Sequence, residues 1–284
     1  MRSISAPAPL LVLGGVVSVQ FGGALAATLI PRIGAAGTVT LRLGLGVVLL
    51  LAVARPRVRG RALRDWRAVL AFGAVLGLMN LSFYLALARL PLGVAVTIEF
   101  IGPLGLAAVL SRRRRDLVAV LVAAAGVVLV NGRDVHAVNW AGVGFGLLAG
   151  LCWAGYVLLS AETGRRFAQL DGLALAMVVA TVLVAPYGIA SAGGELRGGH
   201  VLLVGAAVAV LSSVLPYSLE LLALRRMRPV VFGVLMSLEP AVGALAGFLV
   251  LDQRLAVLQI AGMACVVAAS IAVTRSRGAE QLDL

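Results

Sequence analysis

The sequence predicts an all-α integral membrane protein of ten transmembrane helices, arranged as two inverted five-helix repeats around a central cavity. Composition is the first observation behind this fold: 61% of the 284 residues are hydrophobic and only 13% are charged. The mean hydropathy is +1.06. A single soluble core cannot bury that much apolar surface, so lipid must be the solvent. The other two observations are the spacing of apolar segments and an internal repeat.

Ten segments are long and apolar enough to cross a bilayer, which takes about 20 residues of helix. Formal charges inside them are limited to Arg42, Glu99, Glu220 and Glu239. The first segment can also be read as a secretory signal cleaved after residues 24–26, but its removal would destroy the repeat, so we expect it to remain. The predicted spans are 10–30, 35–54, 68–88, 92–111, 117–131, 140–161, 172–192, 200–224, 229–251 and 256–274.

The basic residues predict the orientation of the chain. All 24 are Arg, and they cluster between the apolar segments rather than on a face suited to nucleic acid, which we do not expect as a partner. Alternate connections carry 18 Arg on one side and five on the other. By the positive-inside rule both termini are cytoplasmic. Arg without Lys, beside abundant Ala, Gly and Val, indicates a GC-rich bacterial genome. We therefore expect the protein in the bacterial cytoplasmic (inner) membrane.

A weak internal repeat appears when the sequence is shifted by 137 residues, which aligns 84–90 with 221–227 and Pro103 with Pro240. Spans three to five then resemble spans eight to ten. We therefore expect two domains, 1–134 and 135–284, each a five-helix repeat. An odd number of helices inverts the second copy, and inverted repeats allow alternating access to a site at the membrane midplane. A duplicated scaffold is the alternative.

Polar side chains within the spans indicate where a substrate binds, because such groups usually face a bundle interior or a water-filled path. Spans five and ten are almost wholly aliphatic, and we expect them to face lipid. For each amide or aromatic residue, packing between helices is the alternative role. The predicted substrate-binding residues are Gln20, Asn80, Tyr84, Glu99, Trp153, Tyr156, Tyr217 and Glu239.

The intramembrane charges have two interpretations. Glu99 and Arg42 lie at similar depths, so they either form a charge pair or leave Glu99 to bind a substrate ammonium group or a proton. Glu239 is a second candidate, because Pro240 removes a helix hydrogen bond beside it. We expect Glu220 to extend to the cytoplasmic interface near a cluster of Arg, outside the site.

Glycines spaced four residues apart predict close helix contacts, at 73 and 77, at 142, 146 and 150, and at 243 and 247. No catalytic or metal site is expected, since the only Cys residues, Cys152 and Cys265, lie within apolar runs and no nucleophile–base pair can be assembled. The protein is therefore predicted not to be an enzyme and to need no cofactor.

Three motifs carry a resemblance to a known family: Ile-Glu-Phe-Ile-Gly-Pro-Leu at 98–104, Ser-Leu-Glu-Pro at 237–240 and Leu-Asp-Gln-Arg-Leu at 251–255. With these motifs the chain resembles the EamA branch of the drug/metabolite transporter superfamily, most closely the bacterial threonine and homoserine exporters. In that superfamily the last turn more often reads Gly-Glu-Arg. The resemblance implies that spans one to four and six to nine surround the cavity, with five and ten peripheral.

The resulting hypothesis is a secondary transporter that exports small amino acids or related metabolites. The expected partners are a small zwitterionic or polar substrate and membrane lipids, with protons as a coupling ion if transport is an exchange. The alternatives are export of purines, drugs or other metabolites, and a non-transporting scaffold or lipid scramblase. Both a monomer and a homodimer are compatible with the sequence.

Overall fold

The computed structural model describes residues 7–56, 58–111, 114–130, 139–167, 170–224, 226–227 and 229–280. All regular secondary structure in these residues is helical. Nine of their helical segments are long and apolar enough to span a membrane. The predicted fifth span corresponds to the shorter helix α6 (Arg114–Val130), whose predicted end at residue 131 lies outside the described residues. The helical membrane fold is confirmed, and the number ten stays a prediction.

The helices form two compact units, and each unit takes segments from both halves of the chain. The first unit consists of Met1–Ala24, Pro91–Val138 and Leu211–Leu284. The second consists of Leu25–Leu90 and Asn139–Val210. Compactness therefore does not follow chain order. The two five-helix domains expected at 1–134 and 135–284 remain a prediction.

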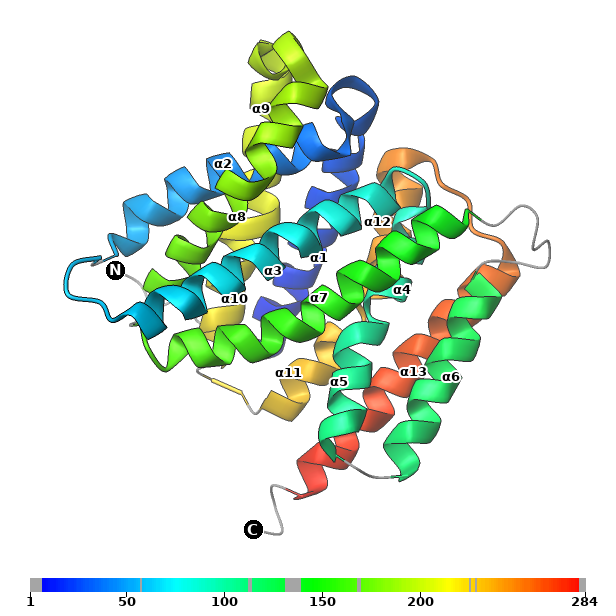
Figure 1. Cartoon of the computed structure of the whole chain (residues 1–284). Helices are drawn as coiled ribbons and strands as arrows, with labels where there is room; N and C mark the ends of the chain where they lie inside the picture. Colours follow the sequence, from blue (N-terminus) through cyan, green and yellow to red (C-terminus); the bar gives the residue numbers. More distant parts are fainter. Residues whose placement is uncertain are drawn as a thin grey trace. The chain divides into compact units, whose positions relative to one another are not determined.

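In the second unit, α3 lies along α7 and α8, and α2 packs against α8 and α9 (Figure 1). The chain bends at Gly34, where φ is +69°, a conformation that glycine adopts readily. The unit's helices are α2 (Ile30–Ala54), α3 (Leu63–Leu87), α7 (Trp140–Gly164), α8 (Asp171–Ala192), the 3₁₀ helix η1 (Gly193–Arg197) and α9 (Gly199–Ala209).

In the first unit, α13 lies along α6 and α12 packs against α4 (Figure 1). A Cβ atom placed on Gly126 of α6 would be 2.6 Å from the carbonyl oxygen of Gly262, so these two helices touch through backbone. Besides α6, the unit's helices are α1 (Ala8–Ala27), α4 (Leu92–Glu99), α5 (Ile101–Ser111), α10 (Leu215–Leu224), α11 (Pro229–Met236), α12 (Glu239–Leu251) and α13 (Val257–Glu280).

Two predicted spans are broken, and each break has a proline as its cause. The span 92–111 divides into α4 and α5 after Glu99, and the span 229–251 divides into α11 and α12 after Met236. Proline lacks an N–H and its ring clashes with the carbonyl four residues earlier. For Pro103 that carbonyl belongs to Glu99, and for Pro240 to Met236. The breaks thus occupy equivalent positions when the sequence is shifted by 137 residues.

The predicted span 200–224 is also irregular. Its helices α9 and α10 are joined by a π-helical turn, η2 (Val210–Val214), a feature frequent at functional sites. The hydroxyl of Ser18 in α1 donates a hydrogen bond to the carbonyl oxygen of Leu211, at 2.6 Å. A Cβ on Gly22 would lie only 2.3 Å from the Ser212 hydroxyl oxygen. Helix α1 therefore packs directly against this turn.

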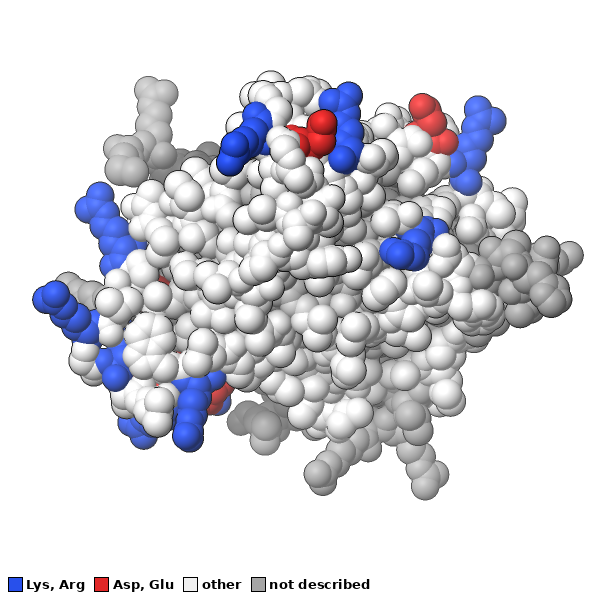
Figure 2. All heavy atoms as spheres, turned by 45° about the horizontal axis from the view of Figure 1, so that its top comes forward, with Lys and Arg blue, Asp and Glu red and all other residues white. Residues whose placement is uncertain are grey.

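Large apolar side chains are exposed on the helices, as expected for surfaces that contact lipid. Leu203 of α9 is 72% exposed and Val257 of α13 is 84% exposed. Figure 2 shows that charged side chains are few and are separated by broad uncharged surface. An apolar surface of this extent is unusual for a soluble monomer and fits a bilayer.

Candidate functional site

The first unit buries a carboxylate at the start of α12. Glu239 is 6% exposed, and the side-chain amide of Gln20 in α1 donates a long hydrogen bond to its Oε2 atom, at 3.5 Å. Within the described residues this is its only hydrogen-bond partner. A buried negative charge is costly unless it is paired. Glu239 is thus suited to receive a positive partner, either a proton or a substrate cation.

Two further carboxylates of the first unit lie within electrostatic range of Glu239, namely those of Glu99 and Glu220. Like charges repel, which strengthens the need for a cation here. Glu220 contacts α1, since a Cβ on Gly15 would be 3.6 Å from Glu220 Oε1. Its expected extension to the cytoplasmic interface stays a prediction. The available signal for the contact was that Glu220 is the only polar residue in the segment 219–224.

Small residues allow Gln20 to reach Glu239. Gly243 lies one helical turn beyond Glu239, and a Cβ there would be 3.0 Å from the Gln20 amide oxygen. The predicted role of Gly243 in close helix contact is confirmed. In this unit Ser237, which is fully buried, donates to the carbonyl oxygen of Gly233 at 2.9 Å and lies 2.7 Å from the Ser270 hydroxyl. These contacts hold the broken span against α13.

In the second unit Arg42 contacts one of the predicted residues, Tyr84. Its Nη1 atom donates to the Tyr84 hydroxyl at 3.4 Å, and its guanidinium carbon lies 5.7 Å from the centre of the Tyr84 ring. Tyr84 is fully buried. Asn80, one turn earlier and 5% exposed, donates its side-chain amide to the carbonyl oxygen of Leu76 in its own helix, at 2.9 Å. Tyr84 thus acts as a local partner of a cation.

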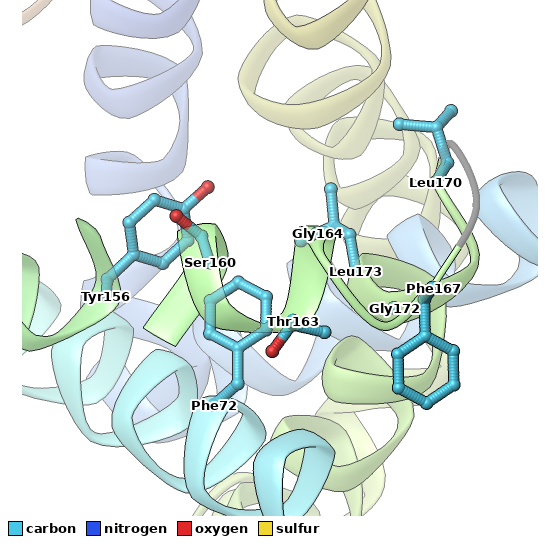
Figure 3. A pocket seen from close by; sticks show the side chains of 9 residues that line it. All are labelled: Phe72, Tyr156, Ser160, Thr163, Gly164, Phe167, Leu170, Gly172 and Leu173. Atoms are coloured by element: carbon cyan, nitrogen blue, oxygen red, sulfur yellow. The ribbon is translucent and has the colours of Figure 1, made fainter. Parts of the chain in front are cut away.

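A pocket of about 130 Å³ opens in the second unit where α7 ends and α8 begins. Figure 3 shows hydroxyls of α7 lining it, with the Thr163 oxygen pointing towards the Phe72 ring. Thr163 is 2% exposed, and its hydroxyl oxygen has no hydrogen-bond partner in the described part of the chain. The lining residues carry no formal charge, so the pocket suits an uncharged group. They are Phe72, Tyr156, Ser160, Thr163, Gly164, Phe167, Leu170, Gly172 and Leu173.

An ion network surrounds the same end of α7. Arg166 forms ion pairs with Glu162 and, at 3.3 Å, with Asp65 at the start of α3. The hydrogen bond to Glu162 raises the pKa of the Arg166 guanidinium above its ordinary value. Arg61 donates to the carbonyl oxygen of Arg166 at 3.1 Å and lies over the Phe167 ring, 4.5 Å from its centre. These contacts connect the ends of α3 and α7.

The remaining predicted residues stay predictions. Trp153 is half-buried on α7, and Tyr156 lies beside Phe72 with ring centres 5.2 Å apart. Tyr217 belongs to α10, but its side chain lies outside what the structure describes. Arg42 and Glu99 belong to different units, and their pairing is untested. Among the described residues no group of three His, Cys, Asp or Glu side chains is arranged to hold a metal ion.

Comparison with known proteins establishes the family. The model of the EamA-like transporter family matches residues 140–275. The threonine/homoserine exporters RhtA of Salmonella typhimurium and of Escherichia coli K12 are each 40% identical to this chain, over 93% of it and 90% of their own length. The chain belongs to the EamA-like transporter family. Family membership and the long apolar helices together show that the chain is a multi-pass membrane protein.

A solved crystal structure shares the fold of this EamA-like protein. It aligns with a TM-score of 0.65 over 94% of this chain and 96% of the other, at 16% identity. At that identity the likeness concerns the fold alone. The family resemblance read from motifs 98–104, 237–240 and 251–255 is confirmed by the comparisons.

Proposed function

We propose that this protein is a secondary transporter that exports small amino acids of the threonine and homoserine type across the bacterial cytoplasmic membrane. The observation that carries the proposal is the 40% identity, over 93% of the chain, to exporters named for these two amino acids. Export of purines, drugs or other metabolites is the alternative that a substrate screen tests. The energy source proposed is a gradient, either of protons in an exchange or of the substrate itself in facilitated diffusion.

Transport by alternating access is the proposed mechanism, and the helix pairing within each unit supports its inverted repeat. In the second unit α2 packs on α8, and in the first unit α4 packs on α12 and α6 on α13. Each pair joins spans that correspond in the two predicted repeats, and the proline breaks after Glu99 and Met236 correspond as well. Repeats of opposite orientation provide two similar packings that expose a midplane site to either side.

Glu239 is the proposed ion-binding group of the first unit. It is buried, it receives one long hydrogen bond from Gln20, and two more carboxylates lie within electrostatic range. A substrate ammonium group or a proton would compensate its charge, and alternation between the two would couple export to proton entry. The other predicted substrate-binding residues are retained as proposals: Asn80, Tyr84, Glu99, Trp153, Tyr156 and Tyr217.

The orientation proposed is cytoplasmic for both termini. The Arg-rich connections support it, because Arg residues near helix ends are retained on the cytoplasmic side. In this orientation α4 begins on the outer side and Glu99 lies seven residues deeper, about 10 Å at 1.5 Å per residue. Cysteine labelling in intact cells tests this orientation, with one cysteine added at either terminus of the protein. Labelling of either terminus from outside the cell would contradict it.

Reconstituted vesicles test the function. Wild type should move radiolabelled threonine or homoserine with saturation, faster when the acceptor side of the membrane is more acidic. Glu239→Gln should lower the rate at least about tenfold, because contacts with buried charged groups contribute roughly 1.5–3 kcal/mol. Glu195→Gln is the matched control, since Glu195 is exposed in η1. Melting in detergent verifies that each variant is folded.

Each outcome of that experiment decides one point. If wild type moves neither amino acid, the proposed substrate class is wrong, and a screen of purines and cationic drugs follows. If no solute is moved but labelled lipids change leaflet, the protein is a scramblase. Equal rates and equal pH dependence in Glu239→Gln and wild type would remove Glu239 from the site while leaving the substrate class intact.

A further inference from the structure

The turn between α12 and α13 closes over the start of α4 within the first unit. Asp252 ends α12 in the left-handed conformation, with φ of +53°, and the next residue, Gln253, donates its backbone N–H to the carbonyl oxygen of Gly247 at 3.1 Å. The Gln253 side-chain oxygen then accepts the backbone N–H of Leu92 at 2.9 Å. One side chain therefore caps the first turn of a helix distant in sequence.

Two glycines, which have no side chain, make this contact possible. A Cβ on Gly247 would lie 2.6 Å from the Gln253 side-chain oxygen. One residue after Leu92, a Cβ on Gly93 would lie 2.8 Å from the Cα atom of Ala244. Helices α4 and α12 therefore approach backbone to backbone, and Gln253 joins them at the end of that contact. In the proposed orientation this end faces outward.

The geometry is compatible both with this turn and with the Gly-Glu-Arg that is more usual in the resembling family. A left-handed residue suits Gly, and Asp is among the few other residue types that adopt it without a large penalty. A Glu carboxylate accepts a backbone N–H as an amide oxygen does. Asp252 and Gln253 therefore retain the backbone conformation and the acceptor of the commoner pair.

The corresponding position in the other repeat cannot form this bond. Shifting by 137 residues places Pro229, the first residue of α11, where Leu92 stands at the start of α4. Proline has no backbone N–H to donate. The position that corresponds to Gln253 is Asp116. The hydrogen bond therefore exists in one repeat only, and the two ends of the proposed transporter differ in this respect.

We propose that Gln253 is a positioning residue that holds the outer ends of α4 and α12 together and so favours the state in which the unloaded transporter accepts substrate from the cytoplasm. The inference rests on the proposed function. An exporter benefits from this bias, because it must load from the inside. In this proposal α4 and α12 part at this end when the transporter opens to the outside, and the Leu92 bond opposes that movement.

We call the hydrogen bond from Leu92 to Gln253 the latch. Two substitutions test whether it holds α4 and α12 together or only caps a helix. Gln253→Leu removes the acceptor, whereas Gln253→Glu keeps one. The matched control is Gln259→Leu. Gln259 also accepts a backbone N–H at 2.9 Å, but the donor, Ala256, lies at the start of the helix that contains Gln259. All three variants are compared with wild type in the full-length protein after a melting measurement in detergent.

Amide hydrogen exchange tests the bond without reference to any substrate. Gln253→Leu should exchange faster than wild type over residues 92–96, by about fivefold for the loss of one hydrogen bond. Gln253→Glu and Gln259→Leu should match wild type over these residues. Unchanged exchange in Gln253→Leu would overturn the latch, whatever the protein transports.

Transport asymmetry tests the bias. The quantity measured is the ratio of the external to the internal threonine concentration that gives half-maximal transport, in vesicles of known orientation. Gln253→Leu should lower this ratio by about fivefold, and Gln253→Glu should keep the wild-type ratio. If exchange at residues 92–96 rises but this ratio equals that of Gln259→Leu, Gln253 is a structural cap only and the gating role is wrong. If wild type itself moves no solute, the proposed function fails while the exchange measurement still decides the bond.

Discussion

The first unit places carboxylates and an amide inside its helices, whereas the second places a guanidinium, a phenol and several hydroxyls there. Arg42 of the second unit has Tyr84 as a local partner, and Asn80 bonds its own helix. Glu239 of the first unit has only the long bond from Gln20 among the described residues. The difference supports the proposal that Glu239 binds a cation or a proton, whereas several polar groups of the second unit already have partners within that unit.

The largest expected effects are at glycine contacts, which test whether the two units differ in packing as well as in polar content. Both units should depend on these contacts equally. A Cβ on Gly73 in the second unit would be 2.6 Å from the Ala176 carbonyl oxygen, and one on Gly126 in the first would be equally close to that of Gly262. Gly73→Ala and Gly126→Ala should each lower the free energy of unfolding by roughly 1–3 kcal/mol, measured by denaturation in detergent.

The controls for these substitutions are Gly105→Ala in the first unit and Gly144→Ala in the second, where a Cβ would meet nothing within 4 Å. Both controls should equal wild type or be slightly more stable, since alanine favours helix. Destabilisation in one unit only would show that the units differ in packing as well as in polar content.

Tyr84→Phe tests whether the phenol of the second unit is structural. Removing the hydroxyl deletes the 3.4 Å bond from Arg42 but keeps the aromatic ring beside the guanidinium. We expect a loss of about 0.6 kcal/mol in stability, the mean for hydrogen bonds between membrane helices. Tyr187→Phe is the control, because Tyr187 is 58% exposed. A large loss of transport with unchanged stability would instead place Tyr84 at the substrate.

Glu220→Gln sharpens the account of the first unit. The Glu220 carboxylate repels that of Glu239 through space, without a hydrogen bond between them. Neutralising it should therefore change the proton concentration at half-maximal transport by a factor of about two to three. The measurement is the transport rate over a range of pH in vesicles. A pH profile identical to wild type would show that the two carboxylates titrate independently.

Thr163→Val should have the smallest effect. The buried Thr163 hydroxyl lacks a hydrogen-bond partner in the described residues, and valine has the same shape without the polar atom. Stability should stay equal or rise by up to about 1 kcal/mol. Ser160→Ala is the control, because the Ser160 hydroxyl donates to the carbonyl oxygen of Val157 at 3.1 Å. Destabilisation by Thr163→Val would indicate that the pocket contains an ordered polar partner.

The helical membrane fold was predictable from composition and pattern, and so were the positions of several helices. The expected spans at 140–161 and 172–192 correspond to α7 and α8 within three residues at each end. The breaks before Pro103 and Pro240 fall inside spans that were predicted as continuous, although proline removes a donor wherever it stands. The π-helical turn at Val210–Val214 was not predicted, because it depends on packing against Ser18 and Gly22 of α1.

The candidate site was predicted only in part. Gln20 and Glu239 were singled out as intramembrane polar residues, and the structure brings them together across 219 positions of sequence. The contact of Glu220 with α1 was not predicted, because its depth along one helix says nothing about which helix it faces. The pocket around Thr163 was missed, although Tyr156, Ser160 and Thr163 have the spacing of one helix face.

The sequence by itself determined that the chain is helical and membrane-bound, because backbone groups in lipid must be satisfied within each helix and every span carries its own hydropathy. It also determined the family, through motifs that are local. Tertiary structure decided which spans form each compact unit, that Gln253 caps α4, and that Glu239 meets Gln20 and lies near Glu220. These contacts depend on side chains from distant segments, whose meeting is governed by packing rather than by any local pattern.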